Sequence, residues 1–494
     1  MKKSFTNVLL ASFITLSVCS MPACGKKSTA TPATPDKPTT PTTPTTPLTS
    51  DVAMWLTTAD QSQAFTKQNV AINFGSGAVS GPVININAAT TYQTIDGFGY
   101  CLTGGSAQVI NLMNDTEKNA LLTDLFATDG THIGVSYLRI SIGASDMSGF
   151  DYTYDEVTPG QTDPDLKNFS IDQEKTDLIP ILKKILAINP NIKILASPWT
   201  APTWMKSSPI GANGFMGGSL NTAYYSAYAN YFVKYIQAMK AQGITIDAIT
   251  PQNEPLNANN NPAMTMQANE QATFIKNNLG PQFKAAGITT KIIAYDHNAD
   301  HVDYPTTIFQ DTAASAYIDG SAFHLYAGSI NALSPLHDMY PAKNIYFTEQ
   351  YTPATGGFGG DLNWHVTNLI VGATRNWCRN VLEWNLATDP NYGPHTDGGC
   401  SGCKGALTIS SSTVTRNVSY YIIAHASKFV RPGAVRIASD YLSNLPNVAF
   451  KNTDGSKVLI VLNSGTSQQS FSFKIDGKTA TSTLDAGAVA TYIW

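Results

Sequence analysis

Short apolar segments typical of buried strands alternate with longer segments of helical spacing between residues 95 and 384. This alternation is typical of βα units, in which consecutive parallel strands are joined by helices. Strands are expected at residues 95–101, 136–142, 192–197, 246–250, 291–295, 320–324, 344–348 and 380–384. Because eight parallel strands close a barrel, the sequence predicts an α/β fold of the (β/α)8 TIM-barrel type.

Three of the intervening helices have clear limits. Residues 177–188, 224–241 and 269–286 carry apolar side chains at helical spacing. Gly243 and Gly287 follow the second and third of these segments and act as stop signals.

Both ends of the folded chain have a different pattern. Residues 70–74 and 83–87 alternate between apolar and polar side chains, as half-exposed strands do, and so do residues 448–450, 457–463, 470–473 and 488–494. The simplest joint interpretation is one β-sandwich built from both termini beside the barrel. The expected domains are therefore sandwich strands at 51–92, the catalytic barrel at 93–432 and the rest of the sandwich at 433–494.

The first fifty residues indicate export. Residues 1–23 resemble a signal peptide, with lysines before an apolar stretch too short to span a membrane. Cys24 follows the small Ala23, as at a bacterial lipoprotein cleavage site; Cys19 is the alternative, although the residue before it is large. Residues 24–50 are mostly Thr, Pro, Ala and Ser and predict an extended linker. We expect an outer-membrane or cell-surface lipoprotein anchored at Cys24, with secretion or a periplasmic location as the alternative.

Charge and composition limit the possible partners. The formal net charge is −4, and 13% of the residues are charged. No nucleic-acid partner is expected, because phosphate binding needs a clustered basic surface and no run of Lys or Arg here is longer than two residues. Aromatic, Asn and Gly residues are plentiful instead, which suits a sugar substrate. We expect a monomer.

Two glutamates stand at the ends of predicted strands. The fourth strand runs into Pro-Gln-Asn-Glu-Pro, which mounts Glu254 on stiff backbone, and the seventh strand ends at Glu349. Catalytic groups of such barrels lie at the carboxyl ends of the strands. Two carboxyls about 5–5.5 Å apart hydrolyse a glycoside with retention, one as nucleophile and one as acid/base. We expect the field of Glu349 to keep Glu254 protonated near neutral pH.

Other strand ends carry polar and aromatic residues. Arg139 should lie inside the barrel, where a buried cation needs a carboxylate, so it is expected to pair with one of the glutamates. Asp146 can hold sugar hydroxyls or serve as a turn residue, and Trp199 can stack on a pyranose or belong to the core. Tyr326 is expected to hydrogen-bond the nucleophile, and Trp384 to form the pocket floor.

Motifs along the barrel resemble glycoside hydrolase family 30, in the branch with glucosylceramidases and β-1,6-glucanases. They are Asp96-Gly97-Phe98-Gly99, Leu138-Arg139 followed by Asp146, Ser197-Pro198-Trp199-Thr200-Ala201-Pro202-Thr203-Trp204, Thr250-Pro251-Gln252-Asn253-Glu254-Pro255, His324-Leu325-Tyr326, Phe347-Thr348-Glu349 and Trp384-Asn385-Leu386.

The resemblance implies a (β/α)8 barrel with a side β-sandwich, retention of configuration and no cofactor. It makes Glu254 the acid/base and Glu349 the nucleophile. The implied sugar contacts are Asp146, Trp199, Asn253, Tyr326 and Trp384, with Arg139 and His324 in support.

Two departures bear on the substrate. Leu325 stands where the glucosylceramidases have Trp, and Gln350-Tyr351 replaces a small residue followed by Cys. We therefore expect an endo-β-1,6-glucanase acting on β-glucan, with a glucosylceramidase or an exo-β-glucosidase of the same family as the alternative. A non-catalytic carbohydrate-binding surface lipoprotein is the alternative outside this class.

Three further stretches have weaker interpretations. Residues 296–303 include His297 and His301, which can chelate a metal if helical. No helix signal is present, so a polar loop facing the substrate is the alternative, and no metal site is expected. Cys400 and Cys403 favour a small disulfide in an exported chain. The glycine-rich residues 356–360 lack the Lys of a phosphate loop and are interpreted as a mobile rim segment.

Overall fold

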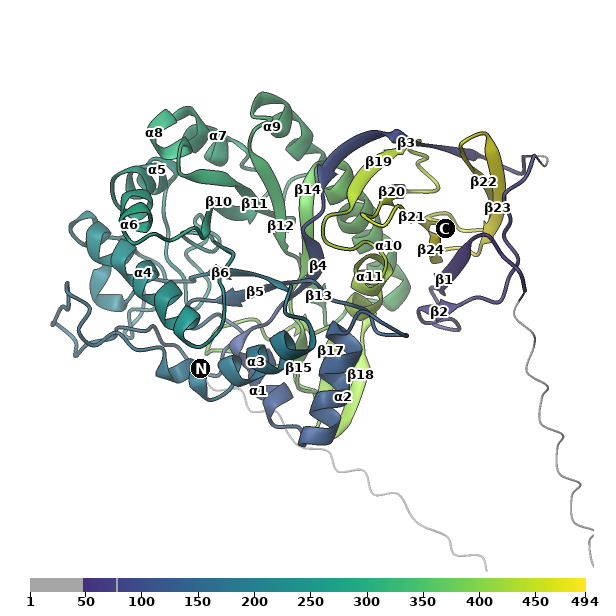
Figure 1. Ribbon diagram of the computed structural model, residues 1–494. Helices are drawn as coiled ribbons and strands as arrows, with labels where there is room; N and C mark the ends of the chain where they lie inside the picture. The colour runs from purple at the N-terminus through teal and green to yellow at the C-terminus, as the bar shows by residue number, and fades with distance from the viewer. Residues whose placement is uncertain (1–47, 77–78) are drawn as a thin grey trace, which may run out of the picture. The chain divides into compact units, whose positions relative to one another are not determined.

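The computed structural model describes residues 48–76 and 79–494, and in it eight parallel strands close into a barrel. In chain order, the first to eighth barrel strands are β4 (Gly97–Cys101), β5 (Tyr137–Ser141), β6 (Lys193–Ser197), β9 (Ala248–Ile249), β10 (Lys291–Asn298), β11 (Ile318–His324), β12 (Asn344–Glu349) and β14 (Cys378–Glu383). Figure 1 shows these strands with the helices around them. The predicted (β/α)8 barrel is confirmed.

The predicted helices lie between these strands. The first two are α3 (Leu178–Ile188) and α4 (Tyr225–Ala241), whereas residues 269–286 form α5 (Ala268–Phe274), the π-helical turn η4 (Ile275–Leu279) and α6 (Gly280–Ala285). The others are α1 (Gly104–Asn111), α2 (Asp115–Phe126), α7 (Asp303–Gln310), α8 (Thr312–Ser315), α9 (Leu333–Met339), α10 (Phe358–His365), π-helical η6 (Val366–Ala373) and α11 (Val418–Ser427). Among the described residues, no helix is long and apolar enough to cross a membrane.

One layer of side chains fills the lower part of the barrel. Seven of the eight strands contribute one member each: Tyr137, Leu195, Ala248, Ile293, Ala322, Tyr346 and Leu382. Gly99 of the remaining strand pairs in register with Tyr137 and Leu382, at the same level. A Cβ atom at Gly99 would meet the carbonyl oxygen of Tyr137 at 1.8 Å, so this approach of strand to strand requires glycine.

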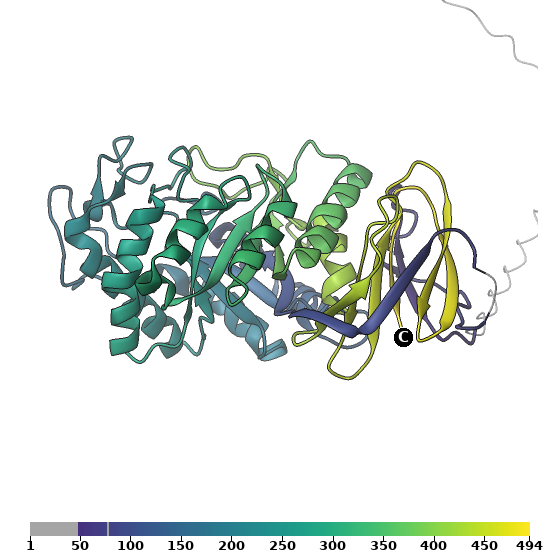
Figure 2. The same ribbon diagram turned by 90° about the horizontal axis from the view of Figure 1, so that it is seen from above.

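The sandwich is built from both ends of the described chain, as predicted. Strands β1 (Ala53–Thr57), β2 (Thr66–Lys67) and β3 (Val83–Thr94) join β19 (Val435–Ser439), β20 (Asn447–Lys451), β21 (Lys457–Leu462), β22 (Gln469–Ile475), β23 (Lys478–Leu484) and β24 (Val489–Ile493). Strand β1 pairs with β24, and β3 lies between β19 and β22. In Figure 2 the purple strand β3 crosses beside the yellow C-terminal strands. The sandwich has its own apolar core.

The strand expected at residues 70–74 is wrong. This segment is not part of the sheet ladder, although Ile72 is buried. Ser50 Oγ accepts from Ile72 N (2.9 Å) and Asp51 Oδ2 accepts from Phe74 N (2.9 Å). Side chains, rather than a neighbouring strand, satisfy these backbone groups, and apolar alternation does not distinguish the two cases.

Short elements line the loops at the carboxyl ends of the barrel strands and elsewhere. They comprise β7 (Lys206–Ser207) with β8 (Ser219–Leu220), β13 (Thr352–Pro353) with β16 (Cys403–Lys404), and β15 (Ala387–Thr388) with β17 (Leu407–Ser410) and β18 (Thr413–Arg416). Single 3-10 turns are η1 (Asp172–Lys175), η2 (Thr203–Met205), η3 (Thr222–Tyr224) and η5 (Ile330–Ala332). The predicted signal peptide, Cys19, Cys24 and most of the linker lie outside the described residues.

The variant Gly99→Ala should lose about 3 kcal/mol of unfolding free energy, because the new methyl group overlaps the Tyr137 carbonyl and the strands must move apart. Urea unfolding measures this loss. Gly360→Ala is the matched control: the glycine is exposed in α10 with open space around it, so alanine should be neutral or slightly stabilising. Equal stability of the two variants would contradict this account of the strand contact.

Candidate active site

A polar layer lies directly above the apolar layer of the barrel. Its members follow the apolar ones by two residues on each strand, because alternate residues of a strand share a face. They are Arg139 on β5, Ser197 on β6, Thr250 after β9, His324 on β11 and Thr348 on β12, all buried. The carboxyl end of the barrel is therefore lined with hydrogen-bonding groups.

The fifth strand departs from this two-residue rule. Tyr295 and Asp296 have φ of 74° and 81°, and the register with β11 shifts between Tyr295 and His297. This bulge turns Asp296, rather than Tyr295, into the polar layer. Tyr295 instead packs in the outer core.

Asp296 collects hydrogen bonds from five side chains. Arg139 Nη2 (2.8 Å), Ser197 Oγ (2.8 Å), Thr250 Oγ1 (2.7 Å), Thr348 Oγ1 (2.6 Å) and His324 Nε2 (3.2 Å) surround its fully buried carboxylate. Burial opposes ionisation of Asp296, but Arg139 and His324 outweigh it and hold the pKa far below its usual range. Asp296 is thus a permanent negative charge beneath the site.

Arg139 connects this charge to the predicted residues above it. Its Nη1 donates to Glu349 Oε2 at 2.6 Å, and its Nη2 also lies 2.6 Å from Asn253 Oδ1. The expected pairing of Arg139 with a glutamate is confirmed, and that glutamate is Glu349. Asp296 and Asn253 are further partners that the pattern of the second strand did not reveal.

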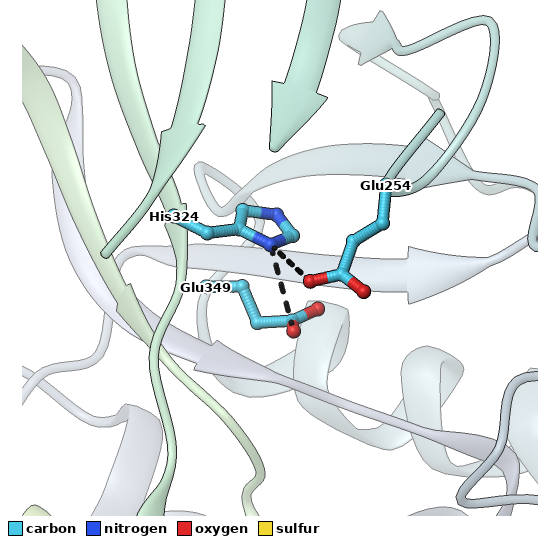
Figure 3. Close-up of side chains that lie close together, drawn as sticks. All are labelled: Glu254, His324 and Glu349. Atoms are coloured by element: carbon cyan, nitrogen blue, oxygen red, sulfur yellow. Dashed lines mark hydrogen bonds and ion pairs between the residues drawn. The ribbon is translucent and has the colours of Figure 1, made fainter. Parts of the chain in front are cut away.

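Glu254 and Glu349 lie next to each other, and one ring nitrogen of His324 contacts both carboxylates (Figure 3). His324 Nδ1 lies 3.1 Å from Glu254 Oε1 and 3.7 Å from Glu349 Oε1, and the three atoms lie within 4.8 Å of one another. Tyr326 donates its hydroxyl to Glu349 Oε1 at 3.0 Å, as predicted. Asn257 Nδ2 donates to Glu254 Oε2 at 2.8 Å. Two carboxylates at this separation can serve as nucleophile and acid/base in a displacement with retention.

The expected protonation of Glu254 is wrong for the free site. Burial opposes its charge, but the hydrogen bond and charge of His324 outweigh burial and lower the pKa of Glu254 to about 2. Burial would also depress the pKa of His324, yet Glu349, Asp296 and Glu254 raise it to about 9. Burial raises the pKa of Glu349, against the charges of His324 and Arg139. The sequence did not show that an imidazolium would lie between the two acids.

A cavity of about 460 Å³ opens above the pair. Its lining residues are Asp146, Glu254, Leu256, Asn257, Asn260, His297, Asn298, Tyr326, Glu349, Tyr351, Trp384, Cys400 and Cys403. Asp146 is buried at this wall, and burial together with Glu349 raises its pKa to about 7. Trp384, expected as the pocket floor, is among the residues that line the cavity and is 3% exposed.

Trp199 does not have the free face that stacking on a sugar requires. It is 2% exposed, its ring packs on Trp384 with centroids 5.4 Å apart, and the Arg139 guanidinium lies over it at 4.8 Å from the ring centroid. Of the two rings, Trp384 is the one that lines the cavity. Contact of a sugar with Trp199 stays a prediction.

The histidine-rich stretch at residues 296–303 does not form a helical chelating pair. His297 lies in β10, His301 follows in the turn, and α7 begins only at Asp303. Among the described residues, Glu254, His324 and Glu349 are instead the group whose potential ligand atoms come together. A metal ion bound there would have to replace the proton between His324 Nδ1 and Glu254. The raised pKa of His324 means that this proton is held tightly.

Two other predictions concern the rim. The disulfide Cys400–Cys403 is confirmed, and it lines the cavity. The glycine-rich residues 356–360 are not simply a loop, because α10 begins at Phe358.

Several residues of the site were not identified from the sequence. The sequence of residues 296–303 assigns no particular role to Asp296 or His297, Tyr351 stands out only as a departure from the family motif, and no pattern points to Asn257. The available signal was position: Asp296 follows the fifth predicted strand directly, as Glu349 ends the seventh. Its inward direction depends on a backbone bulge that apolar alternation does not encode.

The barrel and the facing carboxylates are those of a glycoside hydrolase. The TIM-barrel domain of glycosyl hydrolase family 30 matches residues 95–430, and the beta sandwich domain of this family matches residues 433–492. The chain belongs to glycosyl hydrolase family 30.

Relatives within the family are known by name. An endo-1,6-beta-D-glucanase of Neurospora crassa is 38% identical over 386 residues, 75% of this chain and 79% of the relative. The solved structure of the endo-beta1,6-glucanase BT3312 superposes with a TM-score of 0.84 at 39% identity, covering 90% of this chain and 99% of that one. The putative glucosylceramidase 4 of Caenorhabditis elegans is 28% identical over 440 residues, 84% of this chain and 83% of the relative.

Removing the charge of Asp296 should change the titration of His324. In the wild type, the raised folded-state pKa means that protonated His324 stabilises the fold fully below about pH 6.5, and this contribution is lost as pH rises towards 9. In Asp296→Asn the pKa of His324 should fall by roughly one unit or more, because one of its carboxylate partners is neutral. Histidine NMR spectra recorded against pH measure both values.

Asp300→Asn is the matched control, since Asp300 follows the same strand but is partly exposed and outside the polar layer. It should leave the His324 titration unchanged. An unchanged His324 pKa in Asp296→Asn would contradict the role of Asp296 as the charge beneath the site.

Proposed function

We propose that this protein is a retaining endo-β-1,6-glucanase that cleaves β-glucan by double displacement, with Glu349 as nucleophile and Glu254 as acid/base. The observation that carries the proposal is the approach of the two carboxylates at the ends of the fourth and seventh strands, with facing oxygens within 4.8 Å. Retaining enzymes keep their carboxyls about 5–5.5 Å apart, whereas inverting enzymes leave about 6.5–9.5 Å for a water molecule.

The hydrogen bonds of Glu349 suit a nucleophile. Arg139 holds one carboxylate oxygen and Tyr326 holds the other, so the side chain is fixed in one orientation. Orientation of the attacking group lowers the entropic part of the barrier. Arg139 also offsets the cost of a negative charge in a buried position, which keeps the carboxylate available for attack on the anomeric carbon.

The proton for the departing sugar comes from the pair formed by His324 and Glu254. Since His324 Nε2 bonds Asp296, its Nδ1 either donates to ionised Glu254 or accepts from neutral Glu254. Water in the free site favours the ion pair. A bound sugar removes that water and favours the neutral pair, because isolated charges are costly in an apolar environment. Glu254 then carries the proton that the leaving oxygen needs.

The named relatives support the choice of linkage. Both an endo-1,6-beta-D-glucanase sequence and an endo-beta1,6-glucanase structure are 38–39% identical to this chain over most of its length. In a β-1,6-glucan the leaving group is a primary alcohol, whose oxygen is too basic to depart without protonation. A general acid such as Glu254 is therefore required.

Hydrolysis of glucosylceramide is the second candidate. The similarity to a putative glucosylceramidase favours it. The two candidates differ in the group on the leaving side of the bond, which is a second glucose in one case and a lipid alcohol in the other.

A panel of β-1,3-, β-1,4- and β-1,6-glucans and a glucosyl lipid distinguishes these candidates. We expect turnover on the β-1,6-glucan, with a mixture of short oligosaccharides from the start, and first products that NMR shows to be β-anomers. Release of glucose alone from the glucan would contradict endo action. Preferred turnover of the glucosyl lipid would contradict the choice of substrate.

Glu349→Gln and Glu254→Gln should each lower kcat on the β-1,6-glucan roughly 10³-fold or more. A dinitrophenyl glucoside has a leaving group that needs no proton. With this substrate, the rate of the first step, in which the enzyme is glycosylated, should fall far less in Glu254→Gln than in Glu349→Gln. Glu174→Gln is the matched control: Glu174 is a buried glutamate whose pKa is raised to about 7, chiefly by burial, and it lies away from the cavity lining. Full activity of a folded Glu349→Gln would contradict the proposal.

We also propose that the protein is exported and anchored by a lipid on Cys24, on the strength of its N-terminal sequence. Cys24→Ser should move the protein from the membrane fraction to the soluble fraction, as measured by fractionation and detergent phase partitioning. Cys19→Ser is the matched control and should leave the attachment intact. Retention of Cys24→Ser in the membrane would contradict an anchor at this residue.

A further inference from the structure

One loop, residues 396–404, closes one side of the active-site cavity. We call it the disulfide loop, because Cys400 and Cys403 are bonded within it and both line the cavity. Cys403 packs in a buried group with Trp384, Trp199, Met147 and Cys101. The loop is therefore part of the pocket wall rather than a surface appendage.

Backbone contacts attach the disulfide loop to three other barrel loops. Thr396 N donates to the carbonyl oxygen of Asp146 at 2.9 Å, which ties it to the loop of the second strand. Cys403 pairs in register with Pro353, beyond the seventh strand. Asn261, beyond the fourth strand, donates its Nδ2 to the carbonyl oxygen of Asp397 at 2.8 Å. The wall is thus held at both ends and from the fourth-strand side.

The closest approach is at Gly399. A Cβ atom on this glycine would meet the Asp146 carbonyl oxygen at 2.3 Å. Asp146 itself is buried, and its Oδ1 has no hydrogen-bond partner. The disulfide loop therefore presses directly on the segment that presents an unpaired carboxylate oxygen at the cavity wall.

The cavity has two sides relative to the scissile bond. Glu254 follows β9 and His297 lies on β10, on the leaving-group side. Trp384 and the two cysteines follow β14, which is four strands from β9 in the ring of eight and so lies across the barrel. Because Glu254 must face the oxygen on C1, the retained glucose extends away from it, towards Trp384 and the disulfide loop.

The chemistry of glucose makes this wall selective. The O3 and O4 hydroxyls are equatorial, and O4 lies opposite C1, so a chain attached through either oxygen continues in the plane of the ring and meets the wall. The O6 oxygen is carried on an additional rotatable bond, so a chain attached there can turn out of the plane towards the mouth of the cavity.

We propose that the disulfide loop selects the linkage of the retained part of the substrate: it excludes glucose units extended through O3 or O4 and admits those extended through O6. This inference rests on the proposed function. It assigns linkage selection to the disulfide loop, through the position of its sulfur atoms and its hold on Asp146.

The test uses three 4-nitrophenyl disaccharides, the β-gentiobioside (1,6), the β-laminaribioside (1,3) and the β-cellobioside (1,4), which differ only in the linkage on the retained side. The wild type should have the highest kcat/KM on the gentiobioside. In Cys400→Ala/Cys403→Ala, the ratio of the gentiobioside value to each of the others should fall roughly tenfold or more, because the wall recedes. A selective rise on the 1,3 and 1,4 substrates is the decisive change.

Two further measurements separate the bond from the bulk of the sulfur atoms. Cys400→Ser/Cys403→Ser keeps most of the side-chain volume without the link, and reductant applied to the wild type breaks the same bond; both should shift the ratio in the same direction. Cys378→Ser is the matched control, since Cys378 is a buried free cysteine outside the cavity lining, and it should leave the ratio unchanged.

The outcomes distinguish the inference from the function on which it rests. An unchanged ratio in the folded alanine variant, or in the reduced wild type if that variant does not fold, overturns the role of the disulfide loop. Absence of wild-type turnover on all three glycosides and on β-1,6-glucan overturns the proposed function, and the inference with it.

Discussion

The buried carboxylate of Asp296 is the interaction on which the rest of the site depends. It accepts hydrogen bonds from Arg139 and His324 and from three hydroxyl groups, those of Ser197, Thr250 and Thr348. Its own carbonyl oxygen accepts from the backbone N–H of Glu254 at 3.0 Å. A buried charge is costly unless it is paired and fully hydrogen-bonded. Two of the partners of Asp296, Arg139 and His324, also contact Glu349 and Glu254, so the residues that stabilise the buried charge include those that hold the two glutamates.

The two glutamates above Asp296 have different hydrogen-bond partners. Arg139 reaches Glu349 from below and Tyr326 reaches it from the side, so both of its oxygens are occupied. Glu254 bonds His324 and Asn257, and its backbone has a φ of 43°, which is uncommon for a residue with a side chain. The pKa of Glu254 in the free site reflects the imidazolium beside it rather than the role of an acid. In the proposed mechanism, the change in solvation on substrate binding moves the proton to Glu254.

Loops that lie beyond the barrel strands contribute to the lining of the cavity above the two glutamates. The barrel positions the glutamates through its strands, but the wall opposite Glu254 belongs to the disulfide loop, attached to loops of the second, fourth and seventh strands. The sandwich uses both ends of the described chain, and β3 leads from it directly into the first barrel strand. The strands therefore position the two glutamates, and the contacts between loops shape the cavity.

The sequence by itself determined the barrel, the sandwich and the position of the two glutamates at strand ends. The spacing of apolar residues and the alternation of strands with helices are local patterns in the sequence. Once eight parallel strands close into a ring, all of their carboxyl ends lie together. The same rule identified Arg139, Tyr326 and Trp384. Only the tertiary structure decided that Asp296 turns inward, because a bulge breaks the alternation at β10. It also decided that Trp199 packs on Trp384, that His324 bonds Glu254 and lowers its pKa, and that Cys400–Cys403 lines the cavity. These facts depend on contacts between segments distant in sequence, which no local pattern specifies.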